Sequence, residues 1–300
     1  MKKLTLFLFI FFGPTGFSQE APQDAKEVIK AIYTEALGQQ QGYQWLHHIC
    51  TEIGPRPSGS EASNQAARYT MQMMLDAGAD TAWLQPVEVP KWHRGDEWSK
   101  AYAGGELISL PTTALGGSVP TPAEGVKAQV VEVGSFEELE ALGEEGIKGK
   151  IVFYNTYMDH SLISTFNAYG GAVKYRWAGA MEAGKYGAVA TVMRSVTLLR
   201  DDLPHTGAMS YGDSEVKVPC AAISWQGADK LSAMLEGGKV ELELYLDCGV
   251  QGTATNYNMI ADFKGSDKPE EIMLVGGHID SWDLGQGAQD DGAGCAHAMQ

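Results

Sequence analysis

The stretch that decides the fold is IMLVGGHIDSWDLGQGAQDDGAG, residues 272–294. It opens with four apolar residues, 272–275, which lie between a charged segment and two glycines. A short apolar run of this kind predicts a strand that is buried on both faces. One imidazole and several carboxylates follow the end of this strand, starting at His278. Because open α/β sheets form their sites beyond the carboxyl ends of strands, we expect an α/β fold with its chemistry here.

The residue types in this stretch predict a metal site. Imidazole and carboxylate are ligands that suit zinc and similar divalent ions. His278 and Asp280 are two residues apart, so they share one face of an extended segment. Asp280 can then accept the second ring N–H of His278, which fixes the tautomer of a metal-bound imidazole. Asp290 follows twelve residues after His278, and the glycines in between allow the chain to return to the same ion.

A simpler interpretation of the same residues has to be weighed against a metal site. Asp residues are common at helix N-termini, and a helix is predicted to start near Asp291. A polar loop with a helix cap would then explain the carboxylates. The His-x-Asp pair alone carries little weight, and the metal hypothesis depends on the whole stretch.

The run GGHIDSWDLGQGAQDDGAG resembles the first metal motif of the co-catalytic di-zinc exopeptidases, and within that family it is most similar to the carboxypeptidase Q branch. The resemblance implies a mixed-sheet α/β fold and two Zn²⁺ ions in a complete active site. It implies that His278 binds one zinc, that Asp290 bridges both, and that Asp280 is the catalytic residue that orients His278. It also implies a cis peptide bond between Asp290 and Asp291.

Composition and charge narrow the classes of partner. The chain has 300 residues, of which 44% are hydrophobic and 20% charged, as in ordinary globular proteins. Its formal net charge is −16, which argues against nucleic acid or an anionic membrane as a partner. We therefore expect no nucleic acid and no membrane among the partners.

The first eighteen residues predict a signal peptide. Two lysines precede the apolar run 4–12, and small residues follow at Gly16 and Ser18. The apolar run is too short to span a bilayer, and a buried N-terminal helix is the alternative. A secreted or periplasmic location is therefore predicted. Export permits disulfides, and among the four cysteines we favour a bond between Cys220 and Cys248.

Three helices and two strands are predicted before residue 112. The helices cover 24–39, 42–53 and about 60–78, with Ser60 as the cap of the third. The segments 83–91 and 96–102 alternate as strands and are predicted to form a hairpin, with Pro86 and Pro90 on an edge.

The texture changes around residues 111–122 to Pro, Thr, Gly and Ser, and an inserted unit is predicted to begin there. Its strands and helices are predicted to alternate, and a capping box at Ser135-Phe-Glu-Glu138 opens a short helix after the first strand. The other segments are 126–133, 149–154, 170–186, 187–193, 218–224, 226–235 and 239–246. This order and its sequence resemble an α+β protease-associated domain, which carries no chemistry of its own. The predicted division is 1–18 signal peptide, 19–112 first part of the peptidase domain, 113–250 insert, and 251–300 second part.

Four further residues invite a functional interpretation. Arg56 lies in a helix–helix turn that resembles a segment of the same family, and we assign it a structural role. His205 is a candidate ligand, but a loop histidine that faces the cleft or packs locally is favoured. Arg194 and Arg200 can bind a substrate carboxylate through bidentate contacts, although surface arginines are the commoner case.

The segment 254–263 is predicted to return to the main sheet as a strand beside 272–275. In the resembled family, a Glu-Glu pair, an Asp and a His downstream of this motif supply the general base and the remaining ligands. This sequence holds no such set after residue 294. We therefore expect a C-terminally truncated fragment that is insoluble or inactive on its own.

The resulting hypothesis is a zinc-dependent exopeptidase that hydrolyses short peptides, specifically dipeptides with free termini, by attack of metal-activated water. The resemblance is also compatible with a homodimer. Two alternatives stay open. One is a non-catalytic binding protein that uses the protease-associated domain, and the other is a di-zinc amidohydrolase that acts on N-acyl amino acids.

Overall fold

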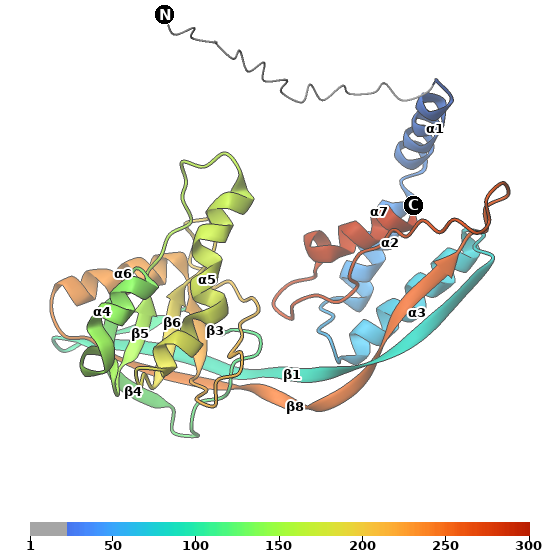
Figure 1. The fold of residues 1–300 in the computed structure, drawn as a ribbon. Helices are drawn as coiled ribbons and strands as arrows, with labels where there is room; N and C mark the ends of the chain where they lie inside the picture. Colours follow the sequence, from blue (N-terminus) through green and yellow to red (C-terminus); the bar gives the residue numbers. More distant parts are fainter. Residues whose placement is uncertain (1–22) are drawn as a thin grey trace, which may run out of the picture.

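The computed structural model describes residues 23–300. The predicted signal peptide, residues 1–18, lies outside the described residues. The described chain forms two lobes that are joined by a long two-stranded ribbon (Figure 1). The first lobe contains residues 41–76 and 272–300, and the second lobe contains residues 106–240. Its helices are α1 (Gln23–Gln39), α2 (Gln41–His48), η1 (Ile49–Ile53), α3 (Glu61–Asp76), α4 (Phe136–Ile147), α5 (Thr165–Gly184), α6 (Trp225–Glu236), η2 (Ala288–Gly292) and α7 (Ala293–Met299).

The strands form one mixed sheet with the order β2-β1-β8-β4-β5-β6-β7-β3. The ribbon consists of β1 and β8, which pair antiparallel along nearly their whole length. The four central strands from β4 to β7 are parallel to one another, and the pairs of β3 with β7 and of β4 with β8 are antiparallel. The strands are β1 (Thr81–Ala103), β2 (Glu106–Leu110), β3 (Thr112–Ala114), β4 (Val126–Val133), β5 (Ile151–Tyr154), β6 (Ala190–Arg194), β7 (Cys220–Ile223) and β8 (Glu241–Asp262).

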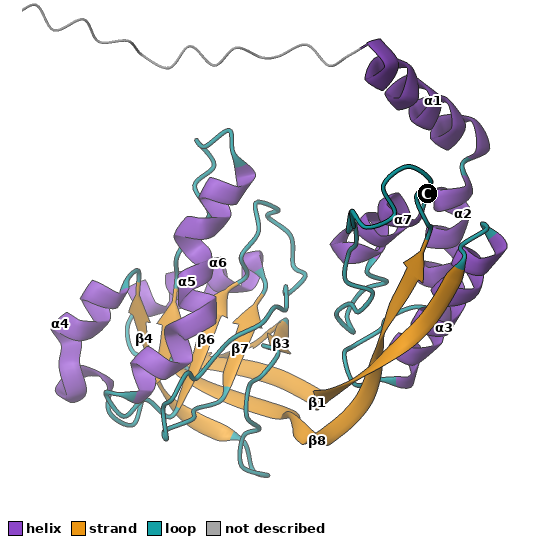
Figure 2. Cartoon of the chain, turned by 45° about the vertical axis from the view of Figure 1, so that its right-hand side comes forward, coloured by secondary structure: helices purple, strands orange, loops and turns teal. Residues whose placement is uncertain are grey.

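The second lobe surrounds the parallel strands with helices on both faces (Figure 2). Side chains of β5 alternate between two cores, because successive residues of a strand point to opposite faces. Phe153 joins the core that contains Leu231 of α6, whereas Tyr154 joins the core that contains Leu139 of α4 and Tyr175 of α5. Burial on both faces explains why β5 and β6 are continuous apolar runs.

The first lobe packs helix α3 against the far part of the ribbon (Figure 1). Ser60 caps α3 as predicted, and its hydroxyl accepts a hydrogen bond from the Ser63 N–H at 3.1 Å. The predicted cap at Ser135 is confirmed for α4, whereas Glu138 bonds the residue before the cap. Ser135 accepts from the Glu138 N–H at 3.1 Å, and the Glu138 carboxylate accepts from the Gly134 N–H at 2.6 Å.

The predicted hairpin between residues 83 and 102 is wrong. Both segments belong to the single strand β1, which crosses from one lobe to the other. Register shifts between Pro90 and Trp92 and between Arg94 and Glu97 break the alternation and made one strand look like two. The edge position of Pro86 and Pro90 is confirmed, since within residues 23–300 this part of β1 pairs only with β8.

The predicted buried strand at residues 272–275 is also wrong. The segment has no regular secondary structure, and its side chains are 90%, 92%, 90% and 70% exposed. Residues 254–262 form the end of β8 and pair with β1, so they do not lie beside 272–275 in a sheet. A strand needs a hydrogen-bonded neighbour, and among residues 23–300 no strand pairs with this segment.

The preferred disulfide between Cys220 and Cys248 is not formed, and all four cysteines are buried free thiols. Cys220 belongs to the core on the α5 face of the sheet, and Cys248 belongs to the core on the α6 face. The Cys248 thiol instead lies 3.6 Å from the carbonyl oxygens of Ser118 and Val119.

None of the helices within residues 23–300 has the length and hydropathy that a bilayer crossing requires. The division at residues 112 and 250 stays a prediction. Both β1 and β8 run through the two lobes without a break, so the sheet is shared between the predicted peptidase and protease-associated parts.

Candidate functional site

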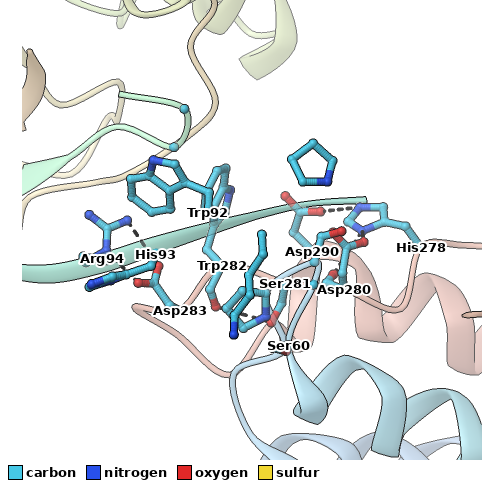
Figure 3. Close-up of a pocket in the computed structure, with 17 residues that line it drawn as sticks. Ser60, Trp92, His93, Arg94, His278, Asp280, Ser281, Trp282, Asp283 and Asp290 are labelled. Carbon is cyan, nitrogen blue, oxygen red and sulfur yellow. Dashed lines mark hydrogen bonds and ion pairs between the residues drawn. The ribbon is translucent and has the colours of Figure 1, made fainter. Parts of the chain in front are cut away.

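A cavity of about 510 Å³ lies where the two lobes meet at the middle of β1 (Figure 3). It is bounded by the segment before α3, by β1 around Trp92, by the loop at Gly116, and by the loop that follows His278. Its volume falls in the range of ordinary small-molecule sites. Three of the residues that line it are His278, Asp280 and Asp290, the three predicted site residues.

His278 lies between the two predicted carboxylates (Figure 3). Its Nδ1 is 3.1 Å from the carbonyl oxygen of Asp280 and 3.2 Å from Asp280 Oδ1, so Nδ1–H donates to this residue. Its Nε2 is 2.9 Å from Asp290 Oδ1. The loop therefore brings all three residues together, with one carboxylate on each ring nitrogen.

The surroundings of His278 raise its pKa above the usual histidine value. Partial burial is the largest single cause and lowers the pKa, because it disfavours the charged ring. The negative charge of Asp280 acts in the opposite direction and raises the pKa. The carbonyl of Asp280 and the charge of Asp290 raise the pKa further. Two carboxylates thus create a negative site that attracts a proton or a metal cation to Nε2.

The turn around Asp290 aims its carboxylate at His278. Gly287 adopts a left-handed conformation with φ of 61°, and Asp290 and Asp291 leave the helical conformation within η2. The peptide bond between Asp290 and Asp291 is cis, as the resemblance implies. Asp291 turns the other way and accepts a hydrogen bond from the backbone N–H of His278 at 3.1 Å.

The donor set fits part of a zinc site. Two ligands of a tetrahedral zinc at 2.0–2.1 Å are roughly 3.3 Å apart, and His278 Nε2 and Asp290 Oδ1 are 2.9 Å apart. Asp280 faces Nδ1, so it orients the ring and cannot share an ion bound to Nε2. Over residues 23–300, no three His, Cys, Asp or Glu side chains form a group that could hold a metal. The roles of His278 and Asp290 as ligands stay a prediction.

Arg56 holds the predicted site loop from within the first lobe. Its side chain is fully buried, and its guanidinium donates to the carbonyl oxygens of Gly54, Ile279, Gln286 and Gly287 at 2.7–3.1 Å. Its backbone exchanges two hydrogen bonds with Ser281, because the Arg56 N–H donates to Ser281 Oγ and the Ser281 N–H donates to the Arg56 carbonyl. The structural role assigned to Arg56 agrees with this position.

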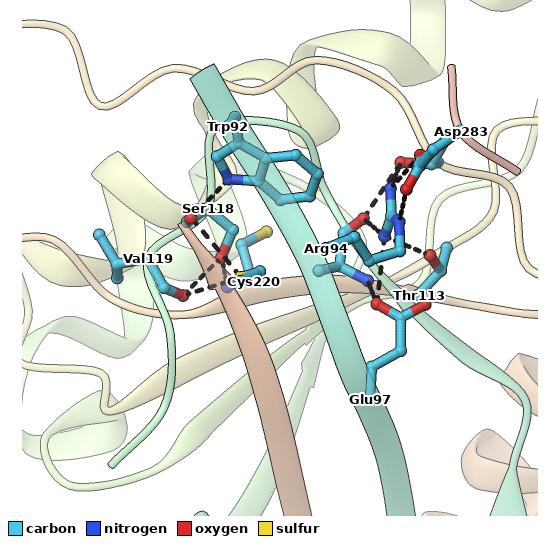
Figure 4. A network of polar contacts seen from close by, with 11 residues as sticks. Trp92, Arg94, Glu97, Thr113, Ser118, Val119, Cys220 and Asp283 are labelled. Carbon is cyan, nitrogen blue, oxygen red and sulfur yellow. Dashed lines mark hydrogen bonds and ion pairs between the residues drawn. The ribbon is translucent and has the colours of Figure 1, made fainter. Parts of the chain in front are cut away.

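Arg94 and Asp283 form a contact that the sequence did not indicate. Arg94 Nε lies 2.6 Å from Asp283 Oδ2, and its NH2 lies 3.2 Å from Asp283 Oδ1 (Figure 4). These residues are 189 positions apart, and no local pattern marks either as a partner of the other. The one signal was the position of Asp283 inside the quoted stretch.

Two indole rings line the cavity between these charged groups (Figure 3). The Nε1–H of Trp92 donates to the carbonyl of Ser118 at 3.0 Å, which fixes its ring against the second lobe. The ring of Trp282 packs on Gly116, where a methyl group would collide with it. The cavity therefore combines an apolar wall with the polar group at His278.

The remaining candidates lie away from this cavity. His205 does not line it and is held through its backbone N–H, which donates to Ser195 Oγ at 2.8 Å. Arg194 is neither a surface residue nor a cavity residue. It is buried between the rings of Tyr157 and Trp225 and pairs with Asp229 at 2.7 Å. Arg200 also packs over Trp225, so neither arginine reaches the site.

Sequence comparison finds known peptidases that are similar to this chain. The model of peptidase family M28 matches residues 258–300, which contain the three predicted site residues. Carboxypeptidase Q of Xenopus laevis is 41% identical over 273 residues, which is 90% of this chain and 56% of that protein. Carboxypeptidase Q of Homo sapiens is 37% identical over 272 residues, with 90% and 55% coverage. The chain therefore spans about half the length of the curated relatives it matches.

Solved structures of peptidases also resemble the structure of this chain. The chain is similar to the peptidase M28 precursor from Shewanella amazonensis, with a TM-score of 0.86 and 35% identity over 91% of this chain and 62% of that one. A zinc aminopeptidase from Bacillus subtilis shares the fold with a TM-score of 0.58 at 22% identity. The mixed α/β fold predicted from the sequence is thereby confirmed.

Proposed function

Because this chain is a carboxypeptidase Q-like member of peptidase family M28, we propose that it contributes the substrate cavity and two metal ligands of a zinc-dependent exopeptidase. The observation that carries the proposal is the position of His278 between Asp280 and Asp290 at the edge of a 510 Å³ cavity. The chemical class of the relatives and the donor set of this loop point to the same metal.

In this proposal, each residue of the loop has one task. His278 would hold zinc through Nε2, because Asp280 accepts the hydrogen bond from Nδ1–H and keeps the ring in the required tautomer. Asp290 has two carboxylate oxygens and would be the ligand shared by the two ions. When bound, zinc polarises a carbonyl group and acidifies water at neutral pH. Arg56 keeps the loop in place by donating hydrogen bonds to its backbone carbonyls.

The cavity supports a short substrate. Its volume of about 510 Å³ matches a ligand of a few dozen atoms rather than a folded chain. We propose short peptides as the substrates, and dipeptides with free termini as the preferred class. The rings of Trp92 and Trp282 provide apolar surface for a substrate side chain, in the same cavity as His278 and Asp290.

Other parts of the proposal rest on the resemblance. A catalytic zinc takes three protein ligands, so we propose that further ligands and the general base come from residues outside these 300. We also propose that residues 113–250 act as a protease-associated domain, that the protein is exported to the periplasm or secreted, and that it forms a homodimer.

The test is a zinc-dependent peptidase assay on the protein in its full natural length. A panel of dipeptides with free termini is incubated with the purified protein before and after treatment with a chelator. We expect hydrolysis that disappears with the chelator and returns when Zn²⁺ is added. We expect His278→Ala to lose both activity and bound zinc, and Asp280→Asn to lower zinc affinity about 10–100-fold.

His205→Ala is the matched control, because this histidine lies outside the cavity and should leave zinc content and turnover unchanged. Peptidase activity that resists the chelator would contradict the metal assignment. Hydrolysis of N-acyl amino acids without dipeptide cleavage would replace the substrate class. Absence of any hydrolysis by a zinc-loaded protein would favour a non-catalytic binding protein.

A further inference from the structure

The loop from His278 to Asp283 lies between the two lobes and contacts both of them. Asp280 accepts from the ring of His278, and Ser281 is bonded in both directions to Arg56 of the first lobe. The next two residues face the second lobe. Trp282 packs on Gly116, and Asp283 pairs with Arg94. Successive residues of one short loop are therefore held first by the first lobe and then by the second.

Arg94 is saturated with hydrogen-bond acceptors. Besides Asp283, its guanidinium donates to Glu97 Oε2 at 3.1 Å, Thr113 Oγ1 at 2.6 Å, the Ala114 carbonyl at 2.7 Å and Thr206 Oγ1 at 2.9 Å (Figure 4). These partners account for all five N–H groups of an arginine. Only 6% of the Arg94 side chain is exposed, so water and salt screen these contacts less than they screen a surface ion pair.

The acceptors other than Asp283 lie on the second lobe or on the ribbon. Thr113 and Ala114 belong to β3, Thr206 belongs to the loop before β7, and Glu97 lies on β1 itself and also accepts from the Ala114 N–H at 2.8 Å. Arg94 is therefore part of the second lobe's hydrogen-bond network. Through its bonds to Asp283, that network holds the loop of His278.

The packing of Trp282 on Gly116 is a second contact between the loop and the second lobe, and it does not involve Arg94. The Gly116 N–H donates to the Gly207 carbonyl at 2.9 Å, and its carbonyl accepts from the Met209 N–H at 3.0 Å, so the backbone cannot yield easily. The Trp282 ring lies where a side chain at position 116 would be. Glycine is thus required at 116 for Trp282 to take this position.

We propose that Arg94 is a positioning residue for the His278 loop, and that the second lobe, through Arg94 and Gly116, determines the geometry of the ligand loop. The lobe without predicted chemistry of its own then acts as a clamp on the site. The inference concerns the loop to which the proposed function assigns the metal, but the clamp can be tested without metal or activity. Failure of one proposal is therefore distinguishable from failure of the other.

The experiment is hydrogen–deuterium exchange of the metal-free protein in its full natural length, followed in peptides that cover residues 277–292. The amides of Ser281 and Gly292 are hydrogen-bonded in this loop and report its opening. In Asp283→Asn the charge-assisted pair with Arg94 is lost, and we expect exchange of these amides to rise about tenfold. We expect the same direction in Gly116→Ala, because Trp282 must leave its position.

Exchange in β5 and β6 is the internal reference and should stay unchanged in both variants, which separates a local clamp from general loss of stability. Gly171→Ala is the matched control, because a methyl group there meets no atom within 4 Å. If Asp283→Asn does not fold, Gly116→Ala carries the test alone. Unchanged exchange of the 277–292 peptides in a folded variant, or an equal rise in β5 and β6, would overturn the proposal.

Discussion

At the scale of the residue, Arg56 connects the first lobe to the loop of His278. A fully buried guanidinium that donates to four backbone carbonyls replaces the strands or helix ends that would otherwise satisfy those carbonyls. The loop at 279–287 has no regular hydrogen-bonded structure of its own. The first lobe therefore fixes the conformation that presents His278 through an arginine that lies far away in the sequence.

Replacing Arg56 tests this dependence. We expect Arg56→Met to lower the free energy of unfolding by about 2–4 kcal/mol, because it keeps the apolar volume but leaves several buried carbonyls without donors. Urea denaturation followed by tryptophan fluorescence measures the change. Arg68→Met, which removes an exposed pair with Glu61, is the control and should change stability by less than about 1 kcal/mol. Equal effects of both substitutions would contradict the structural role of Arg56.

At the scale of the element, the segment at 272–275 departs most from the pattern that its sequence shows. Four consecutive apolar residues predict a buried strand, yet all four side chains are largely in contact with solvent. The prediction failed because an apolar run indicates only that a segment prefers apolar surroundings. Whether it forms a strand depends on a neighbouring strand elsewhere in the fold. Exposed apolar runs of this kind promote association.

The consequence is a prediction about the solubility of the 300-residue chain. We expect Ile272→Lys combined with Leu274→Lys to raise the concentration at which the chain stays in solution and to reduce binding of the dye ANS, since two exposed apolar side chains are removed. Val216→Lys, at a single exposed valine elsewhere, is the comparison and should have little effect. Unchanged ANS binding in the double variant would show that other apolar surface dominates.

At the scale of the whole molecule, the buried thiols link stability to pH. Burial raises the pKa of Cys220 to about 12 and those of Cys248 and Cys295 to about 11. An unfolded thiol has a pKa of about 8.5. The unfolded chain therefore loses thiol protons first, so this contribution to stability is complete below about pH 8.5 and declines as the pH rises toward 11.

We expect the urea midpoint of the protein to fall between pH 8.5 and pH 10.5, and to fall less steeply in Cys220→Ala. The thiol reagent DTNB at pH 8 should react slowly with the folded protein and with all four cysteines after unfolding, because all four are buried and free. Rapid reaction of the folded protein would contradict their burial. A reaction with only two thiols after unfolding would reveal a disulfide.

The sequence alone was sufficient for the local features. The helix caps at Ser60 and Ser135 and the alternation of strands and helices in the second lobe follow from nearest-neighbour chemistry and hydrophobic pattern. The proximity of His278, Asp280 and Asp290 also follows from their spacing within one glycine-rich loop. Each of these features depends on residues that are close in the chain, so the order of residues determines it directly.

Only the tertiary structure decided the rest. It showed that β1 and β8 are continuous strands through both lobes, that residues 272–275 pair with no strand, and that Cys220 and Cys248 lie on opposite faces of the sheet. It also placed Arg56 and Arg94 against the loop of His278, across 189 or more positions of sequence. These outcomes depend on which distant surfaces meet, and a buried guanidinium finds its acceptors only once the chain has folded around it.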